Sequence, residues 1–275
     1  MWTRDSAPPS PGEPLPMTAR ATLVLAPNAN AWTFEGTNTW LLAEPGDAQC
    51  AVVDPGPDDD AHLAAILAAA GDRAITAVLV THAHSDHAEL APRLAEVTGA
   101  ALRAAHPRLT AEPLQDDDEI RVGALTVRVL YTPGHTGDSV CFRLPAENSV
   151  LTGDTVLGGG SPIVKPGRLG QFFDSLDRLS EVLAAPGSTI LPGHGPALPD
   201  PLAQIERRRQ ARLRRIDQVV GALAAGIDDR EALVDHLYPD LHPDLRDAAR
   251  VSVDAVLAHV RTDPDPLPTR GEPRR

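Results

Sequence analysis

The feature that most constrains this chain is a short apolar run that ends directly in a cluster of histidines. Residues 77–80 are all apolar, and Thr81 then leads into four side chains of metal-binding type: His82, His84, Asp86 and His87. The apolar run predicts a short buried strand. The cluster therefore lies on a loop at a strand end, where a rigid scaffold presents functional groups. Four such side chains so close together have little structural purpose, and they indicate a metal site.

Three further candidate ligands stand in the same setting. His135 follows the alternating run at 125–131, Asp154 follows the run at 149–151, and His194 follows the run at 189–191. Glycine or proline lies beside each of them and permits a tight loop. Any one of these is a weak signal, because a lone histidine beside glycine is more often not a ligand. Together the three are a stronger signal, because each follows a predicted strand as the first cluster does.

Taken in order, these motifs resemble the signature of the metallo-β-lactamase superfamily: His-x-His-x-Asp-His, a Gly-His, an Asp after a strand, and a last Gly-His. The resemblance covers residues 20–200 or so. It implies an α/β fold, the αββα sandwich, with two mixed sheets packed face to face and helices outside. It also implies two metal ions. One is held by His82, His84 and His135, the other by Asp86, His87 and His194, and Asp154 bridges them.

The chemistry of the donors agrees with this resemblance. Imidazole and carboxylate groups suit zinc, so we expect two Zn(II) per chain, although a set without thiolate also tolerates iron or manganese. Water between two such ions ionises near neutral pH, and the hydroxide attacks the substrate. We expect Asp86 to act also as a catalytic group that takes up a proton. Many β-lactamases of the superfamily have Cys where this chain has Asp154, which disfavours antibiotic hydrolysis.

The remaining sequence divides into two parts. Strand-like and helical runs alternate up to about residue 200, whereas the segments 205–223, 231–237 and 245–260 all read as helices. We therefore expect a catalytic domain over residues 19–205 and a small helical domain over 206–262.

Both ends of the chain are rich in proline. Five prolines fall between residues 7 and 16, and residues 263–275 combine proline with charge. We expect disordered tails over 1–18 and 263–275, with Met17 as an alternative start.

Two segments point to a branch of the superfamily. Residues 34–40 and 153–158 resemble the beta-lactamase-like protein 2 group, endoribonucleases of single-stranded RNA with a C-terminal helical domain similar to a winged helix. This resemblance implies RNA cleavage and a winged-helix-like unit over 206–262. Six arginines between 207 and 215 would suit phosphate contacts. A solvated helix face, or pairing with the acidic stretch 116–119, explains them more simply.

Two alternative functions remain open. A thioester hydrolase similar to glyoxalase II would use the same seven ligands, and residues 133–137 fit it, but the C-terminal basic residues that would bind glutathione are not evident. A nucleic-acid-binding regulator without catalysis is the second alternative, and the intact ligand set argues against it. The substrate is accordingly expected to be a small molecule or single-stranded RNA, with the glycine-rich loop 157–166 lining the mouth of the site.

Composition limits the remaining possibilities. The formal net charge of -13 argues against a general nucleic-acid-binding surface. Cys50 and Cys141 lie in apolar runs, form no disulfide framework and are expected to be small buried hydrophobes. The sequence shows neither an apolar run long enough to cross a membrane nor a signal-peptide pattern. We therefore expect a cytoplasmic protein without membrane contact, and the oligomeric state stays open.

Overall fold

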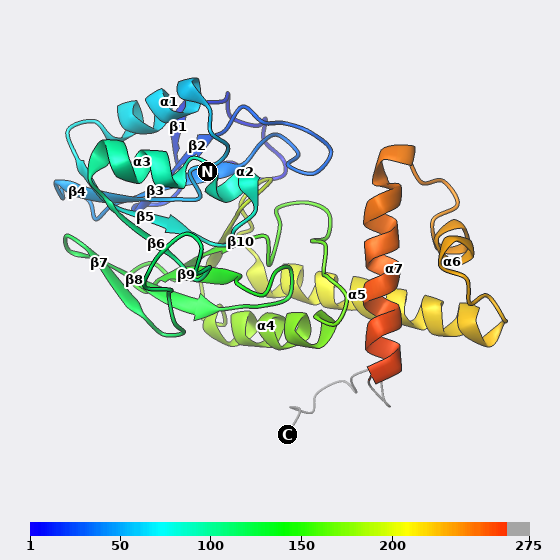
Figure 1. The fold of residues 1–275 in the computed structure, drawn as a ribbon. Coiled ribbons are helices and arrows are strands. Elements are labelled where there is room, and N and C mark those ends of the chain that lie inside the picture. The colour runs from blue at the N-terminus through cyan, green and yellow to red at the C-terminus, as the bar shows by residue number, and fades with distance from the viewer. Residues whose placement is uncertain (263–275) are drawn as a thin grey trace.

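Two mixed β-sheets pack face to face in the computed structural model, which describes residues 1–262 (Figure 1). The first sheet has the order β1-β2-β3-β4-β5-β6, and its strands are β1 (Pro14–Pro16), β2 (Ala21–Leu25), β3 (Asn38–Leu42), β4 (Gln49–Val53), β5 (Ala74–Val80) and β6 (Ala101–Ala104). The second has the order β11-β10-β9-β8-β7, and its strands are β7 (Glu119–Val122), β8 (Leu125–Tyr131), β9 (Val140–Leu144), β10 (Ser149–Gly153) and β11 (Thr189–Pro192).

Each sheet changes from antiparallel to parallel pairing along its width. Strands β1 to β4 pair antiparallel, whereas β4, β5 and β6 are parallel. In the second sheet β7 to β10 pair antiparallel and β10 pairs parallel with β11. Parallel pairs require a crossover, and the crossovers supply helices that cover the outer faces.

The alternation of side chains along the strands produces the layers. In β5, Ala77 and Leu79 enter the core between the sheets, while Val78 and Val80 pack on the opposite face. Because successive side chains point to opposite faces, a strand that is apolar at every position is covered on both sides. This explains why residues 77–80 show no polar alternation.

Helices form the two outer layers. The helices α1 (Asp60–Ala70), α2 (Ser85–Ala88) and α3 (Ala91–Thr98) contribute to the core on the outside of the first sheet. On the outside of the second sheet lie α4 (Leu169–Val182) and α5 (Pro201–Ala224), which share a core with Val150 and Ile190 of that sheet. Figure 1 shows these two groups of helices on opposite sides of the paired sheets. The αββα sandwich expected from the resemblance is confirmed.

The C-terminal helices do not form a separate unit with a boundary at residue 205. Helix α5 is continuous across that point, and α6 (Arg230–Leu237), the 3₁₀ helix η1 (Pro243–Leu245) and α7 (Arg246–Thr262) follow it. Ile216 and Val253 belong to the same core as Phe172 of α4. The helical character was predicted, but the domain boundary falls inside a helix.

A winged helix is not confirmed. Among the described residues that follow Pro192, no strand is present that would form a wing. The predicted tail at 263–275 lies outside the described residues.

The expected disorder of residues 1–18 is wrong. Strand β1 pairs with β2, and the backbone N–H of Gly12 donates to the carbonyl of Leu25 at 2.9 Å. Trp2 and Met17 are both 4% exposed and belong to the core between the sheets. The prolines are accommodated here because proline suits an edge strand, where no neighbouring strand needs its missing N–H.

Two smaller expectations concern cysteines and membranes. Cys50 and Cys141 are free and buried, as predicted, and burial raises the pKa of each thiol to about 11. Within residues 1–262, no helix combines the length and apolar character that crossing a membrane requires.

The packed N-terminus predicts an effect on stability. Replacing Trp2 with Ala should lower the free energy of unfolding by about 3 kcal/mol, because a buried indole is removed from the core. Trp32→Ala is the matched control, since Trp32 is 47% exposed. Denaturant unfolding followed by circular dichroism measures both. Equal, small effects of the two changes would show that the N-terminal segment is not packed as described.

Candidate metal centre

The seven predicted ligands come together where strand ends of the two sheets meet. His82 follows β5 of the first sheet, and His84, Asp86 and His87 lie in and beside the short helix α2. His135, Asp154 and His194 follow β8, β10 and β11 of the second sheet. No predicted ligand is left outside this site.

The ring nitrogens form one close group around His84. Its Nδ1 lies 3.1 Å from Nε2 of His82 and 3.0 Å from Nε2 of His135. These three donors are close enough to one another to hold a single ion. Nδ1 of His135 also lies 2.7 Å from the carbonyl of Ile163. If Nδ1 donates its proton there, Nε2 is left with a free lone pair that faces the group.

A second group forms around His194. Its Nε2 lies 3.1 Å from Nε2 of His87 and 3.3 Å from Oδ2 of Asp86. These three residues also offer donor atoms that can hold one ion. The two groups therefore match the two predicted ligand sets.

Asp154 lies between the two groups. Its Oδ1 is 3.3 Å from Nε2 of His87 and 3.5 Å from Nε2 of His194, whereas its Oδ2 is 3.6 Å from Nε2 of His135. Oδ1 is buried and has no hydrogen-bond partner. A buried carboxylate oxygen without a partner is costly, and a cation at this position would remove that cost. The donor set thus fits a pair of metal ions.

Asp154 and His84 have charge states that suit a cation. Burial opposes ionisation of Asp154, but the positive charges of His87 and His194 hold the pKa of this carboxyl well below its usual range. Burial and the neighbouring His135 lower the pKa of His84 to about 4. At neutral pH the carboxylate is therefore charged and the His84 ring is neutral, which are the forms that bind a metal.

The charge state of His87 is different. Burial opposes protonation of its ring, but the carboxylates of Asp154 and Asp54 outweigh burial and raise the pKa of His87. A metal at this site would therefore displace the proton of that ring.

Asp54 is a functional residue that the sequence analysis missed. Its Oδ2 lies 2.9 Å from Nδ1 of His87 and accepts a hydrogen bond from the Thr81 hydroxyl at 2.7 Å. Its Oδ1 accepts from the backbone N–H of Thr81 at 2.8 Å. One buried carboxylate thus orients a ligand ring and fixes the start of the ligand loop, a known role for carboxylates behind metal-bound histidines. Asp54 directly follows β4, so the rule that found the other ligands would have found it too.

Glycines allow the ligand loops to approach one another. A Cβ at Gly193 would lie 2.7 Å from Cε1 of His87 and 2.9 Å from Oδ1 of Asp154, and a Cβ at Gly153 would lie 2.5 Å from the Thr81 hydroxyl oxygen. Gly153 also has φ +46°, in the left-handed region that glycine adopts most easily. Larger residues at either position would push the ligands apart.

The segment 34–40 holds the last ligand loop. The Asn38 side chain donates to the carbonyls of Pro192 and Gly195 at 2.9 and 2.8 Å, and Trp40 Nε1 donates to the Pro192 carbonyl at 3.2 Å. These bonds bracket His194. The motif seen in the sequence therefore supports the site from the first sheet.

The arginine run on α5 is partly turned inward. Arg208 and Arg212 are buried and donate to the carbonyls of Leu157 and Pro162. Arg209 pairs with Asp177. The proposed pairing with the stretch 116–119 is wrong, since Asp116 pairs with Arg178 at 2.6 Å. Through Arg208 and Arg212 the run anchors the loop that follows Asp154.

Comparison with known proteins bears on the family of this chain. The profile of the Metallo-beta-lactamase superfamily matches residues 32–113 and 102–194. The chain belongs to this superfamily. A solved structure, a Beta-lactamase domain protein from Burkholderia ambifaria, shares the fold with a TM-score of 0.79 and 21% identity, over 95% of this chain and 91% of that one. Family membership and the hydrolases among its relatives make this chain a hydrolase, and the fold implies binding of divalent metal.

Two curated relatives are more similar in sequence. An "Atrochrysone carboxyl ACP thioesterase" from Aspergillus chevalieri is 34% identical over 220 residues, which are 76% of this chain and 69% of the relative. A "Hydroxyacylglutathione hydrolase" from Ectopseudomonas mendocina is 37% identical over 161 residues, which are 57% of this chain and 60% of the relative. This chain therefore spans about two-thirds of the length of such relatives.

The role of Asp54 leads to a prediction about metal affinity. Asp54→Asn should weaken zinc binding by about 10- to 100-fold, because the amide no longer fixes the His87 ring as a carboxylate does. Competition with a chelating dye measures this affinity directly. Asp58→Asn is the matched control, since this neighbouring carboxylate is exposed and pairs with Arg93. Unchanged zinc affinity in Asp54→Asn would contradict the assigned role.

Proposed function

We propose that this chain is a hydrolase with two zinc ions that acts on thioesters. In this proposal His82, His84 and His135 would hold one ion, and Asp86, His87 and His194 would hold the other. Asp154 would serve both. The observation that supports two ions is the placement of Asp154, whose two carboxylate oxygens face different histidine groups.

When bound, such a pair of ions supplies an activated water and stabilises developing negative charge on oxygen. The chain contributes the orientation of every donor. Ile163 and Asp54 fix the rings of His135 and His87 through their Nδ1 atoms, and Gly36 does the same for His194 at 3.2 Å. These partners hold the ligand rings in the geometry needed before any substrate arrives.

Asp86 is the proposed catalytic residue for proton uptake. Its side chain is 31% exposed, against 13% for Asp154, so it is the more accessible carboxylate of the site. The pKa of Asp86 is lowered: burial opposes this, and the hydrogen bond from His194 outweighs it. A carboxylate that is ionised at neutral pH can accept a proton released at the site.

The relatives support thioesters as the substrate class. One carries the name of an acyl-carrier-protein thioesterase and another that of a hydroxyacylglutathione hydrolase, and both names describe cleavage of an acyl–sulfur bond. This favours the alternative function of the sequence analysis over RNA cleavage. The structure adds an argument against RNA, because Arg208 is buried against a backbone carbonyl and Arg209 pairs with Asp177.

Side-by-side assays test the proposal. We expect the zinc-loaded protein to hydrolyse S-lactoylglutathione or benzoyl-S-pantetheine, and to leave single-stranded RNA and a chromogenic cephalosporin intact. A chelator should abolish turnover and added zinc should restore it. Asp86→Ala should lower kcat by about 10²- to 10⁴-fold, the usual range for loss of a proton acceptor. Glu89→Ala, which removes an exposed carboxylate beside α2, should not change it.

Two results would contradict the proposal. Chelator-sensitive cleavage of RNA without thioester turnover would restore the nuclease interpretation. Equal activity of Asp86→Ala and Glu89→Ala would remove Asp86 from the reaction.

A further inference from the structure

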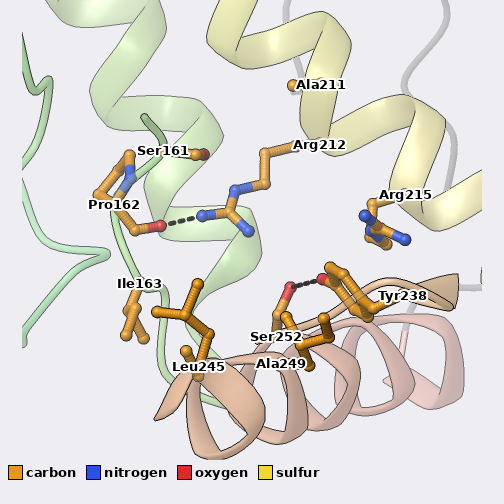
Figure 2. A pocket seen from close by; sticks show the side chains of 12 residues that line it. Ser161, Pro162, Ile163, Ala211, Arg212, Arg215, Tyr238, Leu245, Ala249 and Ser252 are labelled. Carbon is orange, nitrogen blue, oxygen red and sulfur yellow. Dashed lines mark hydrogen bonds between the residues drawn. The ribbon is translucent and has the colours of Figure 1, made fainter. Parts of the chain in front are cut away.

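A pocket of about 300 Å³ lies between the loop that follows Asp154 and the C-terminal helices (Figure 2). Ser161, Pro162 and Ile163 form one side, and Arg212 and Arg215 of α5 form another. Residues of the α6–α7 region close it, among them Tyr238, Leu241, Leu245 and Ala249. None of the residues that line it is acidic.

Arg212 is a buried cation without an ion-pair partner among the described residues. It is 8% exposed, donates to the Pro162 carbonyl, and lies over the Phe172 ring at 5.7 Å from the centroid. Its Nε is buried and has no hydrogen-bond partner. Burial lowers its pKa to about 10, so the guanidinium is still charged at neutral pH. A buried charge is costly unless an opposite charge compensates it.

Arg215 lies almost one turn further along α5 and faces the same pocket. Its guanidinium stacks on the Tyr238 ring at 4.0 Å from the centroid and donates to the Leu237 carbonyl at 3.2 Å. Within residues 1–262 it too forms no ion pair. Nearby arginines behave differently, since Arg246 and Arg250 share Glu231 at 2.9 and 2.8 Å. Two guanidinium groups without a carboxylate partner make this pocket suitable for an anion.

Ile163 lies between the pocket and the predicted metal centre. Ile163 lines the pocket, and its carbonyl lies 2.7 Å from Nδ1 of His135. The rest of the lining combines apolar side chains with the Tyr238 and Ser252 hydroxyls, which lie 3.2 Å apart. Such a lining fits a ligand in which an anionic group is attached to an apolar one.

We propose that this pocket binds the anionic end of the thioester substrate, a carboxylate or phosphate carried on an apolar group, while the thioester lies at the metal centre. The inference rests on the proposed thioesterase function. The anion has two possible sources, a carboxylate on the acyl group or a phosphate on the carrier thiol. Arg212 and Arg215 recognise both through the same charge-assisted hydrogen bonds.

Binding measurements test the pocket without turnover. Isothermal titration of the zinc-loaded chain would use phthalate and pantetheine 4′-phosphate as anionic probes and benzamide as the neutral one. We expect at least one anionic probe to bind, and Arg215→Gln to weaken it by about tenfold or more, since a charge-assisted hydrogen bond is lost. The probe that loses affinity identifies the source of the anion.

Arg214→Gln is the matched control, because Arg214 is exposed and does not line the pocket. Arg212→Gln serves as a second variant, with its unfolding transition recorded because Arg212 also holds Pro162. No binding of either anionic probe would overturn the proposal. Equal weakening by Arg214→Gln and Arg215→Gln would also overturn it, since it would indicate a general effect of surface charge.

Kinetics separate this inference from the proposed function. On a thioester that carries the recognised anion, Arg215→Gln should raise KM by about tenfold and leave kcat nearly unchanged, because the lost contact is remote from the reacting bond. On an uncharged thioester it should change neither. If thioesters are turned over but KM does not respond to Arg215→Gln, the anion-binding role of the pocket is contradicted and the proposed thioesterase function stands. If an anion binds but no thioester is turned over, the proposed thioesterase function is contradicted. The assignment of the pocket to a thioester substrate is then contradicted as well.

Discussion

Histidine and aspartate side chains that follow strands of both sheets converge at the predicted metal centre with their lone pairs facing one another. The rest of the structure depends on this convergence. Nδ1 of His84 lies 3.0 and 3.1 Å from two other ring nitrogens, a separation at which bare lone pairs repel unless a proton or a cation lies between them. Asp154 adds a buried carboxylate oxygen with no partner. The fold holds these groups in place because they lie on loops just beyond buried strands. In addition, Asp54, Ile163 and Gly36 accept hydrogen bonds from three of the rings and fix their orientation.

Much of this site could be predicted from the sequence for a simple physical reason. A strand that is apolar on both faces must be buried, so polar residues just beyond it mark the loop edge of the sheet. That rule marked His135, Asp154 and His194 as candidates, and the family resemblance placed them in one site with the first histidine cluster although they are distant in sequence. The αββα layers followed from the family resemblance, and the alternation of Val78 and Leu79 between two cores shows how the sequence encodes them.

The errors in the prediction have physical causes of their own. The proline-rich N-terminus forms an edge strand, because proline disfavours only central strands. The same segment buries Trp2. The arginine run resembled a phosphate-binding surface, yet Arg208 and Arg212 point inward to backbone carbonyls. Charge composition does not reveal which face of a helix is buried. The predicted domain boundary at residue 205 falls inside α5. This helix packs against both α4 and α7 and belongs to one core with them.

Helix α5 also connects the C-terminal helices to the chemistry. Arg212 holds the carbonyl of Pro162, and the next residue, Ile163, orients His135. The helices therefore support a ligand at the same time as they build the wall of the adjacent pocket. The C-terminal helices thus contact both the surroundings of the predicted metal centre and the pocket beside it.

Anomalous diffraction at the zinc edge, from crystals of the zinc-loaded protein, tests the two-metal centre most directly. We expect two peaks separated by about 3.5–4 Å, one among His82, His84 and His135 and the other among Asp86, His87 and His194, with Asp154 in contact with both. A single peak at saturating zinc, or a second peak away from Asp154, would contradict the two-metal centre.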